Sequence, residues 1–173
     1  MGKGSLDVLK SKIDVDKLLE ILNAALAEEW LAFYQYWVGA QVVVGFQRAE
    51  VEAEFIQHAN EEFGHATMLA KRIKELDGIP VLSPQEWFDK VTCKYDRPDN
   101  FEVMALLKSN IAAERCAIWR YQQIADMTKE VDFVTCDLAK KILADEEEHE
   151  QDLVDFVLDI ESAMEDIKSK LGK

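Results

Sequence analysis

The chain contains two Glu-x-x-His motifs, each of which pairs a carboxylate with an imidazole at helical spacing. They are Glu62 with His65 and Glu146 with His149, in a chain that has three histidines. Residues three apart on a helix project from the same face, so each motif can present both groups to one metal ion. The chemistry that this pattern predicts is therefore metal binding.

A lone glutamate precedes each motif at nearly the same distance. Glu29 lies 33 residues before Glu62, and Glu114 lies 32 residues before Glu146. Two lone glutamates and two Glu-x-x-His motifs are the ligand set of a di-metal carboxylate site in a four-helix bundle. The candidate metal ligands, which are also the candidate catalytic residues, are Glu29, Glu62, His65, Glu114, Glu146 and His149. The alternative, exposed helix charges without a ligand role, explains the doubled arrangement less well.

The donor atoms of this set restrict the metal. Four carboxylates and two neutral imidazoles suit iron or manganese, and the lack of sulfur donors argues against structural zinc or an iron–sulfur cluster. Four carboxylates can share a core only when metal ions neutralise them. We expect two iron ions per subunit, with manganese as the alternative and with two of the carboxylates bridging the ions.

The elements that must position these residues are long helices, because long stretches lack both Gly and Pro. We expect an all-α protein with four long helices over residues 14–44, 48–76, 99–127 and 132–169. Asp14 or Asp16 can cap the first helix, and Gly45 is well placed to end it. Ser83-Pro84 predicts a short helix through residue 88, inside a long crossover between the second and third helices.

Helix-hairpin geometry supports the proposed ligand set. Glu29 and Glu62 each lie about 16 residues from the first turn, and Glu114 and Glu146 lie as far from the second. At about 1.5 Å per residue, both members of each pair sit at one height, about 24 Å from their turn. The long crossover lets the two hairpins pack with all six side chains facing inward.

Composition and charge describe one globular domain over residues 1–173, with residues 1–13 as a flexible arm. Hydrophobic residues make up 49% of the chain and charged residues 31%, as in ordinary globular proteins. The net charge of −14 argues against DNA binding, since a phosphate backbone needs a basic face, and it suits attraction of cations. No apolar stretch reaches a membrane span or resembles a signal peptide, so we expect a cytoplasmic protein without a membrane partner.

Several polar residues lie close to the proposed ligands along the helices. Asp145 precedes His149 by four residues, and Asn110 precedes Glu114 by four, so both lie one turn from the site on its inward side and are expected to form hydrogen bonds with the ligands. Ordinary polar positions are the alternative. The glutamates expected off the inward face, in solvent, are Glu28, Glu61, Glu147, Glu148 and Glu150.

His58 and Glu54 continue the stripe of Glu62 by one and two helical turns. They could form an iron entry route or an auxiliary site, and a hydrogen-bonded interior histidine is the equally good alternative. The role of this pair is left open.

Aromatic residues accompany the ligands at helical spacing. Tyr36 and Tyr121 each lie seven residues after a lone glutamate, which extends a weak internal repeat between the two halves. Together with Trp30, Trp37 and Trp119 they could donate electrons to an oxidising metal centre, although such stripes are more often core.

The cysteines, Cys93, Cys116 and Cys136, are odd in number and have no C-x-x-C spacing. This argues against a zinc or rubredoxin-type module and against a secreted disulfide framework. On the expected helices Cys116 faces away from the metals. It lies about 12 Å in height from Cys136, which disfavours a disulfide between them.

Longer segments resemble a known family. LNAALAEEWLAFYQYW resembles the first helix of bacterioferritins, and ILADEEEHEQDL resembles their fourth-helix motif. The chain is similar to the ferritin superfamily over most of residues 15–160. It is most similar to the Dps-like branch of mini-ferritins, on AAERCAIWRYQQIADMT and WFDKVTCKYD. The resemblance places the first ligand on Glu29 rather than on Glu28.

The resemblance implies a ferritin-like four-helix bundle, a bacterioferritin-type site within each subunit, and a hollow homo-dodecamer. The unbroken C-terminal segment VLDIESAMEDIKSKLGK favours this smaller shell over one of 24 subunits. Phe63 stands where bacterioferritins have their haem-ligating Met, so haem is not supported. Some members of the branch carry a thiol pair near the metals. Cys116 is a candidate for one thiol, and its partner is left open.

The function that the resemblance implies is that of a ferroxidase. Such a protein oxidises Fe(II) with hydrogen peroxide or dioxygen, stores Fe(III) in the shell, and protects against oxidative stress. Three alternatives remain: a rubrerythrin-like or manganese catalase-like di-metal peroxidase, a di-iron hydroxylase, and a DNA-compacting protein of the Dps type. Rubrerythrins usually add a Cys₄ iron module, which this chain lacks.

Overall fold

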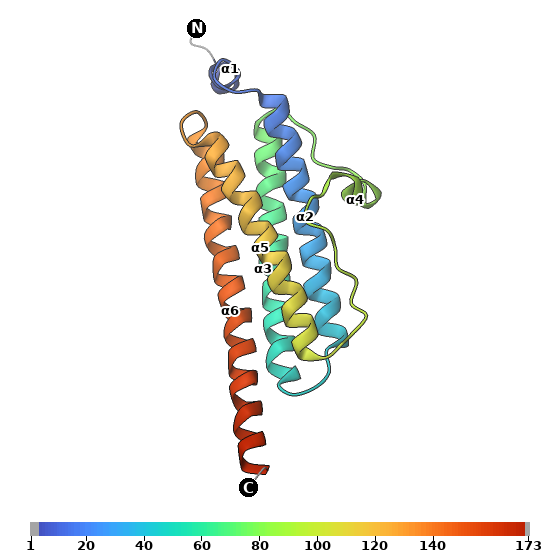
Figure 1. The fold of residues 1–173 in the computed structure, drawn as a ribbon. Helices are drawn as coiled ribbons and strands as arrows, with labels where there is room; N and C mark the ends of the chain where they lie inside the picture. Colours follow the sequence, from blue (N-terminus) through green and yellow to red (C-terminus); the bar gives the residue numbers. More distant parts are fainter. Residues whose placement is uncertain (1–3, 172–173) are drawn as a thin grey trace.

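Figure 1 shows a computed structural model of the chain, which describes residues 4–171. Its elements are the helices α1 (Ser5–Lys10), α2 (Val15–Val42) and α3 (Arg48–Glu75), the 3-10 turn η1 (Pro84–Glu86), and the helices α4 (Trp87–Lys90), α5 (Val103–Thr128) and α6 (Phe133–Leu171). Within residues 4–171 there is no strand beyond a single bridge between Val44 and Glu102. The all-α prediction is confirmed.

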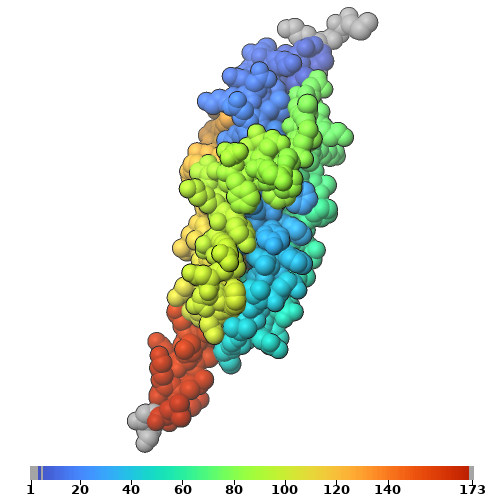
Figure 2. Space-filling view, turned by 90° about the vertical axis from the view of Figure 1, so that its right-hand side faces the viewer, coloured from blue at the N-terminus to red at the C-terminus, as the bar shows by residue number. Residues whose placement is uncertain are grey.

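Four long helices form the bundle. α2 packs along α3, and α5 packs along α6, so the chain consists of two helical hairpins (Figure 1). Residues 76–102 join the hairpins, and η1 and α4 lie within this crossover, as expected. The space-filling view shows the crossover running over α2 and α5 (Figure 2). The C-terminal part of α6 extends beyond the other three helices. None of the described helices is long and apolar enough to cross a bilayer.

The helix boundaries follow local signals. Asp14 caps α2, because its carboxylate accepts a hydrogen bond from the backbone N–H of Lys17 at 3.1 Å. Gly45 follows α2 with φ of 110°, a conformation that favours glycine. α5 begins four residues later than expected from residue 99. Phe101 and Val103 exchange backbone hydrogen bonds with Val44, which keeps the intervening residue extended.

The short helix α1 was not predicted, since residues 1–13 were expected as an arm. Leu9 is only 8% exposed and belongs to the apolar cluster that also contains Val15 and Leu76. Residues 1–3 of that arm lie outside the described part of the chain. Contact between Leu9 and the core explains why the segment carries a helix.

The core is divided into two apolar clusters. One cluster contains buried residues such as Leu22, Leu69 and Ile142 near the α1 end of the bundle. The other contains residues such as Phe55 and Leu153 toward the opposite end. The predicted ligands all fall between these clusters in sequence on each helix. The bundle therefore holds one buried polar layer between two apolar ones.

Candidate metal centre

All six predicted ligands lie in this polar layer, one or two from each long helix. Their exposed fractions are between 0 and 3%. Glu29 comes from α2, Glu114 from α5, and each Glu-x-x-His motif from α3 or α6. Apolar packing on both sides excludes water, so these charged groups need other partners.

The donor atoms form two overlapping groups. In each group the ligand atoms lie within 4.8 Å of one another. The first group consists of Glu29, Glu62, His65 and Glu146, and the second of Glu62, Glu114, Glu146 and His149. Glu62 and Glu146 belong to both groups, which makes them the carboxylates placed to bridge two ions.

Both histidines turn the same ring nitrogen toward the carboxylates. Nδ1 of His65 lies 3.1 Å from both Glu62 and Glu146, and 3.3 Å from Glu29. Nδ1 of His149 lies 3.3 Å from Glu62 and 3.4 Å from Glu146. Nδ1 is therefore the nitrogen available to a metal in both motifs.

Buried atoms without partners show that the residues fit a metal. Glu29 Oε2, Glu62 Oε1, both carboxylate oxygens of Glu146, and Nδ1 of His149 make no hydrogen bond to any of the described residues. Unpaired buried polar atoms are rare, because each costs about 1–3 kcal/mol. Metal ions would satisfy these atoms and neutralise the carboxylates, and the donor set suits iron or manganese.

In the metal-free protein, protons perform part of this neutralisation. Burial alone would lower the pKa of His149, but the adjacent carboxylates of Glu146 and Glu62 raise it to about 12. The pKa of His65 is likewise raised well above its usual range. Burial and the neighbouring carboxylates Glu62 and Glu146 raise the pKa of Glu29. Metal ions therefore compete with protons for the centre.

We expect metal binding to release protons. At pH 7 both histidines are protonated in the metal-free protein because their pKa values lie above 7. A bound ion needs neutral imidazole, so binding two ions should release about two protons per chain or more, and affinity should rise with pH. A pH-stat titration of metal-free protein with Co(II) measures this directly. Binding without proton release would contradict the pKa shifts.

Two tyrosines each donate a hydrogen bond to a ligand glutamate on the other of the helices α2 and α5. Tyr36 on α2 donates to Glu114 on α5, and Tyr121 on α5 donates to Glu29 on α2. Burial, followed by the adjacent carboxylates, raises the pKa of both phenols, so both remain neutral donors. Tyr36 therefore orients Glu114, and Tyr121 orients Glu29; each of these two glutamates belongs to only one of the two overlapping ligand groups. The sequence contained the signal, since each tyrosine follows a lone glutamate by two helical turns.

The tryptophans differ from the two tyrosines, because none of them is fully buried. Trp37 and Trp119 are 43% and 46% exposed, respectively. Trp30 stacks on Trp87 of the crossover with ring centroids 5.7 Å apart. A redox role for these aromatic residues stays a prediction.

The outer nitrogens of the two histidines each contact a carboxylate of the facing helix. Nε2 of His65 lies 3.2 Å from Asp145, so Asp145 contacts one of the ligands, as predicted. Nε2 of His149 lies 2.8 Å from Glu61, which was expected in solvent. The contact of Glu61 was not predicted because helical spacing considers each helix alone, whereas these contacts run between α3 and α6. A carboxylate on the outer nitrogen fixes the ring and raises its basicity.

Two further polar residues also differ from expectation. Asn110 accepts a hydrogen bond from Gln35 at 3.0 Å and donates to the carbonyl of Leu106, so its bonds do not go to Glu114. Glu28, predicted in solvent, is 6% exposed and forms an ion pair with Arg120 at 2.7 Å. Of the other glutamates expected in solvent, Glu147 and Glu148 are exposed, and Glu150 is half-buried and pairs with Arg115.

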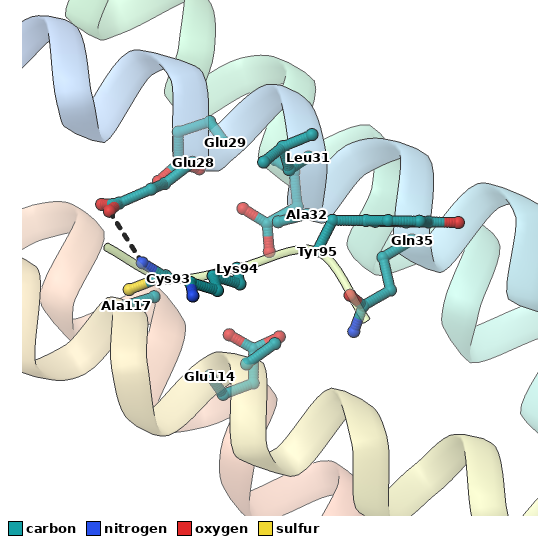
Figure 3. Close-up of a pocket in the computed structure, with 12 residues that line it drawn as sticks. Glu28, Glu29, Leu31, Ala32, Gln35, Cys93, Lys94, Tyr95, Glu114 and Ala117 are labelled. Atoms are coloured by element: carbon teal, nitrogen blue, oxygen red, sulfur yellow. Dashed lines mark hydrogen bonds between the residues drawn. The ribbon is translucent and has the colours of Figure 1, made fainter. Parts of the chain in front are cut away.

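A small cavity joins the centre to the crossover. It has a volume of about 30 Å³, and its lining includes Glu29, Glu62 and Glu114. Figure 3 shows residues 93–95 of the crossover passing between α2 and α5, near Glu29 and Glu114. A cavity of about 10–15 Å³ is enough to hold one water molecule. This cavity thus admits a molecule of about the size of water or slightly larger.

Two kinds of contact hold residues 92–93 of the crossover against α2 and α5. Glu28 accepts hydrogen bonds from the backbone N–H groups of Thr92 and Cys93, at 2.8 and 3.1 Å (Figure 3 marks one of these contacts). Cys93 also forms a disulfide with Cys116 of α5. Cys93 is the partner that the sequence left open, and Cys136 is a buried free thiol.

Removal of the disulfide should destabilise the chain by about 3 kcal/mol. The two cysteines are 23 residues apart, and closing a loop of that length removes about this much entropy from the unfolded state. Urea unfolding of metal-free Cys93→Ser/Cys116→Ser, compared with the oxidised parent, measures the difference. Reductant should destabilise the parent and leave the variant unchanged. Equal stability of parent and variant would contradict the prediction.

Comparison with known proteins reveals similarity along most of the chain. A protein-family profile described as a ferritin-like domain matches residues 19–163. A "DNA protection during starvation protein" from Pyrococcus furiosus is 36% identical over 145 residues, which cover 83% of this chain and 78% of that protein. A bacterioferritin from Rhodobacter capsulatus is 30% identical over 142 residues, covering 82% and 80%.

Solved structures agree with these matches. A structure described as a dodecameric thioferritin, the bacterioferritin-related protein from Bacteroides fragilis, superposes with a TM-score of 0.93 at 56% identity. The match covers 94% of this chain and 96% of that one. Dps from Thermosynechococcus elongatus superposes with a TM-score of 0.79 at 22% identity, covering 89% and 95%, and supports the fold alone.

Proposed function

The chain belongs to the ferritin-like domain family, and on this premise we propose that it is a ferroxidase of the mini-ferritin kind. It would oxidise Fe(II) at the buried centre and store Fe(III) inside a homo-oligomeric shell. The observation that carries the proposal is the pair of overlapping ligand groups, whose buried donor atoms lack protein partners. Those atoms would hold two Fe(II) ions as substrate.

The proposed reaction balances with hydrogen peroxide as oxidant. Two Fe(II) ions lose one electron each, peroxide accepts both electrons, its O–O bond breaks, and two protons complete two water molecules. Dioxygen that accepts two electrons and two protons instead becomes hydrogen peroxide. The protein contributes geometry and charge neutralisation, while the iron supplies the electrons.

Residues of the chain have separate tasks in this reaction. Glu62 and Glu146 would bridge the two ions. Nδ1 of His65 would bind one ion, and Nδ1 of His149 would bind the other. Tyr36 and Tyr121 hold the two remaining carboxylates in orientation through their phenol groups. Ordered carboxylates keep both ions close together when the oxidant arrives.

The size of the cavity beside the centre fits a small oxidant. With about 30 Å³ beside Glu29, Glu62 and Glu114, it suits molecules the size of peroxide or dioxygen. A hydroxylase for a larger apolar substrate would need more room than this. The cavity therefore favours iron or peroxide chemistry over oxidation of an organic substrate.

For assembly, we propose a dodecamer. The protein from Bacteroides fragilis, which is 56% identical and superposes over 94% of this chain, is described as dodecameric. Closed symmetric assembly is the usual form of homo-oligomers, and a closed shell supplies the interior that storage requires.

The test separates the ferroxidase from a di-metal catalase. Metal-free protein receives Fe(II) without air, then limiting peroxide, in an oxygen-electrode cell. The proposal predicts two Fe(II) oxidised per peroxide and no oxygen evolved. Oxygen evolution without net iron oxidation would identify a catalase. Salt-dependent retardation of plasmid DNA would favour a DNA-compacting role, which the charge of −14 disfavours.

A further inference from the structure

A buried histidine outside the ligand set lies close to the centre. His58 on α3 lies one turn before Glu62 and is 0% exposed. Neither of its ring nitrogens makes a hydrogen bond to the part of the chain that the structure describes. The sequence left open a hydrogen-bonded interior histidine at this position, and the structure contradicts that alternative. A buried imidazole that makes no hydrogen bond is costly and requires an explanation.

Two carboxylates converge on this imidazole. Nε2 of His58 lies 3.1 Å from Oε1 of Glu54 and 3.8 Å from Oδ2 of Asp152. The three ligand atoms lie within 4.8 Å of one another. Donors that bind one ion at about 2.0–2.2 Å lie up to about 4.4 Å apart, so this spacing needs only small adjustments to hold an ion. Glu54 and His58 come from α3, and Asp152 comes from α6.

Solvent reaches this cluster. The side chains of Glu54 and Asp152 are 22% and 42% exposed, respectively, while that of His58 is buried. A pocket of about 140 Å³ lies between α3 and α6 and is lined by Gln57, Glu61, Asp145, Glu148, His149 and Asp152. Four of these residues are acidic, so the pocket attracts cations.

The cluster also adjoins the metal centre. The ring of His58 stacks on that of His149, with centroids 4.1 Å apart and planes 18° from parallel. His58 also forms a group with Glu114 and His149, whose ligand atoms lie within 4.8 Å of one another. His58 therefore lies next to the buried ligand His149 and, on its other side, next to Asp152, which lines the pocket.

We propose that Glu54, His58 and Asp152 form a third divalent-cation site, beside the two positions of the centre. One imidazole and two carboxylates suit borderline cations such as Fe(II), Mn(II), Co(II) or Zn(II), whereas Mg(II) and Ca(II) prefer oxygen donors throughout. Solvent molecules from the pocket would complete the coordination. Occupancy of this site does not require oxidation, so it goes beyond the ferroxidase function.

Anomalous diffraction tests the site. Crystals of metal-free protein are soaked in Co(II), and data are collected on both sides of the cobalt absorption edge. The wild type should show a cobalt peak beside Nε2 of His58, in addition to the peaks at the centre. Glu54→Ala/Asp152→Ala should lose this peak and retain the others, since alanine removes the oxygen donors and is tolerated in helices. Glu52→Ala, which removes an exposed glutamate from the same helix, should retain every peak.

Two outcomes would overturn the third site: no peak beside His58 in the wild type, or a peak that persists in Glu54→Ala/Asp152→Ala. Failure of the proposed function has a different signature. In that case cobalt would be absent from the six buried ligands, whether or not it occupies the position beside His58. Because anomalous peaks give the position of each ion, this experiment also distinguishes the third site from weak cobalt binding elsewhere on the surface of a chain with a net charge of −14.

Discussion

Replacing Glu62 with alanine should slow Fe(II) oxidation by about two orders of magnitude or more. Glu62 belongs to both ligand groups and is 1% exposed, so its removal takes a buried donor from both metal positions at once. The adjacent imidazoles of His149 and His65 outweigh the effect of burial and hold the pKa of Glu62 well below its usual range. It is therefore ionised and available to bridge two ions. Losing several kcal/mol of metal stabilisation corresponds to a rate loss of at least about 100-fold.

The matched control for this variant is Glu52→Ala, an exposed glutamate on the same helix. Stopped-flow ferric absorbance after addition of peroxide measures the initial rate of each protein. Glu52→Ala should match the wild type. If Glu62→Ala oxidises iron at the wild-type rate, the six residues are not the ferroxidase ligands.

Replacing Arg120 with alanine should destabilise the fold by about 3–5 kcal/mol. Arg120 donates to both carboxylate oxygens of Glu28, at 2.7 and 2.9 Å, and to the hydroxyl of Thr92 at 3.0 Å. The side chains of Arg120 and Glu28 are only 7% and 6% exposed. Removing one partner of a buried ion pair leaves the other charge without compensation, which costs about this much. The thermal midpoint should fall by roughly 10 °C or more.

Arg115→Ala is the control, because it also breaks an Arg–Glu ion pair of α5. Arg115 lies 2.6 Å from Glu150, but its side chain is 63% exposed. Exposed pairs contribute about 0–1 kcal/mol. Thermal unfolding of the metal-free proteins compares the two variants. Equal losses of stability would show that burial of the Arg120–Glu28 pair does not determine its contribution.

The sequence predicted the elements with strong local signals. Helical periodicity and the cap at Asp14 placed α2, and equal distances from the two turns placed the lone glutamates level with their motifs. The start of α5 was predicted too early. The backbone of Val44 forms hydrogen bonds with Phe101 and Val103, which are distant in the sequence, and local sequence patterns do not reveal such contacts. α1 was missed for a similar reason, since its stability comes from contact of Leu9 with the core.

The partners around the ligands were harder to predict than the ligands. Spacing along one helix correctly placed Asp145 next to the ligands, but it did not identify His65 on the facing helix as its partner. Glu28 was assigned to solvent because it lies off the inward face. The crossover covers that face, and its backbone N–H groups bind Glu28. Such contacts depend on how helices and loops pack, which helical periodicity does not encode.

The measurement that tests the central claim most directly combines iron oxidation with particle mass. Metal-free protein receives a large excess of Fe(II) without air, followed by limiting peroxide or by air, while ferric absorbance and the mass of the particle are recorded. The account predicts rapid oxidation, with on the order of hundreds of irons retained in a closed particle of about twelve subunits, as in the dodecameric relative. Oxidation of only about two irons per chain, with no iron retained, would contradict storage and indicate a di-metal peroxidase or oxygenase.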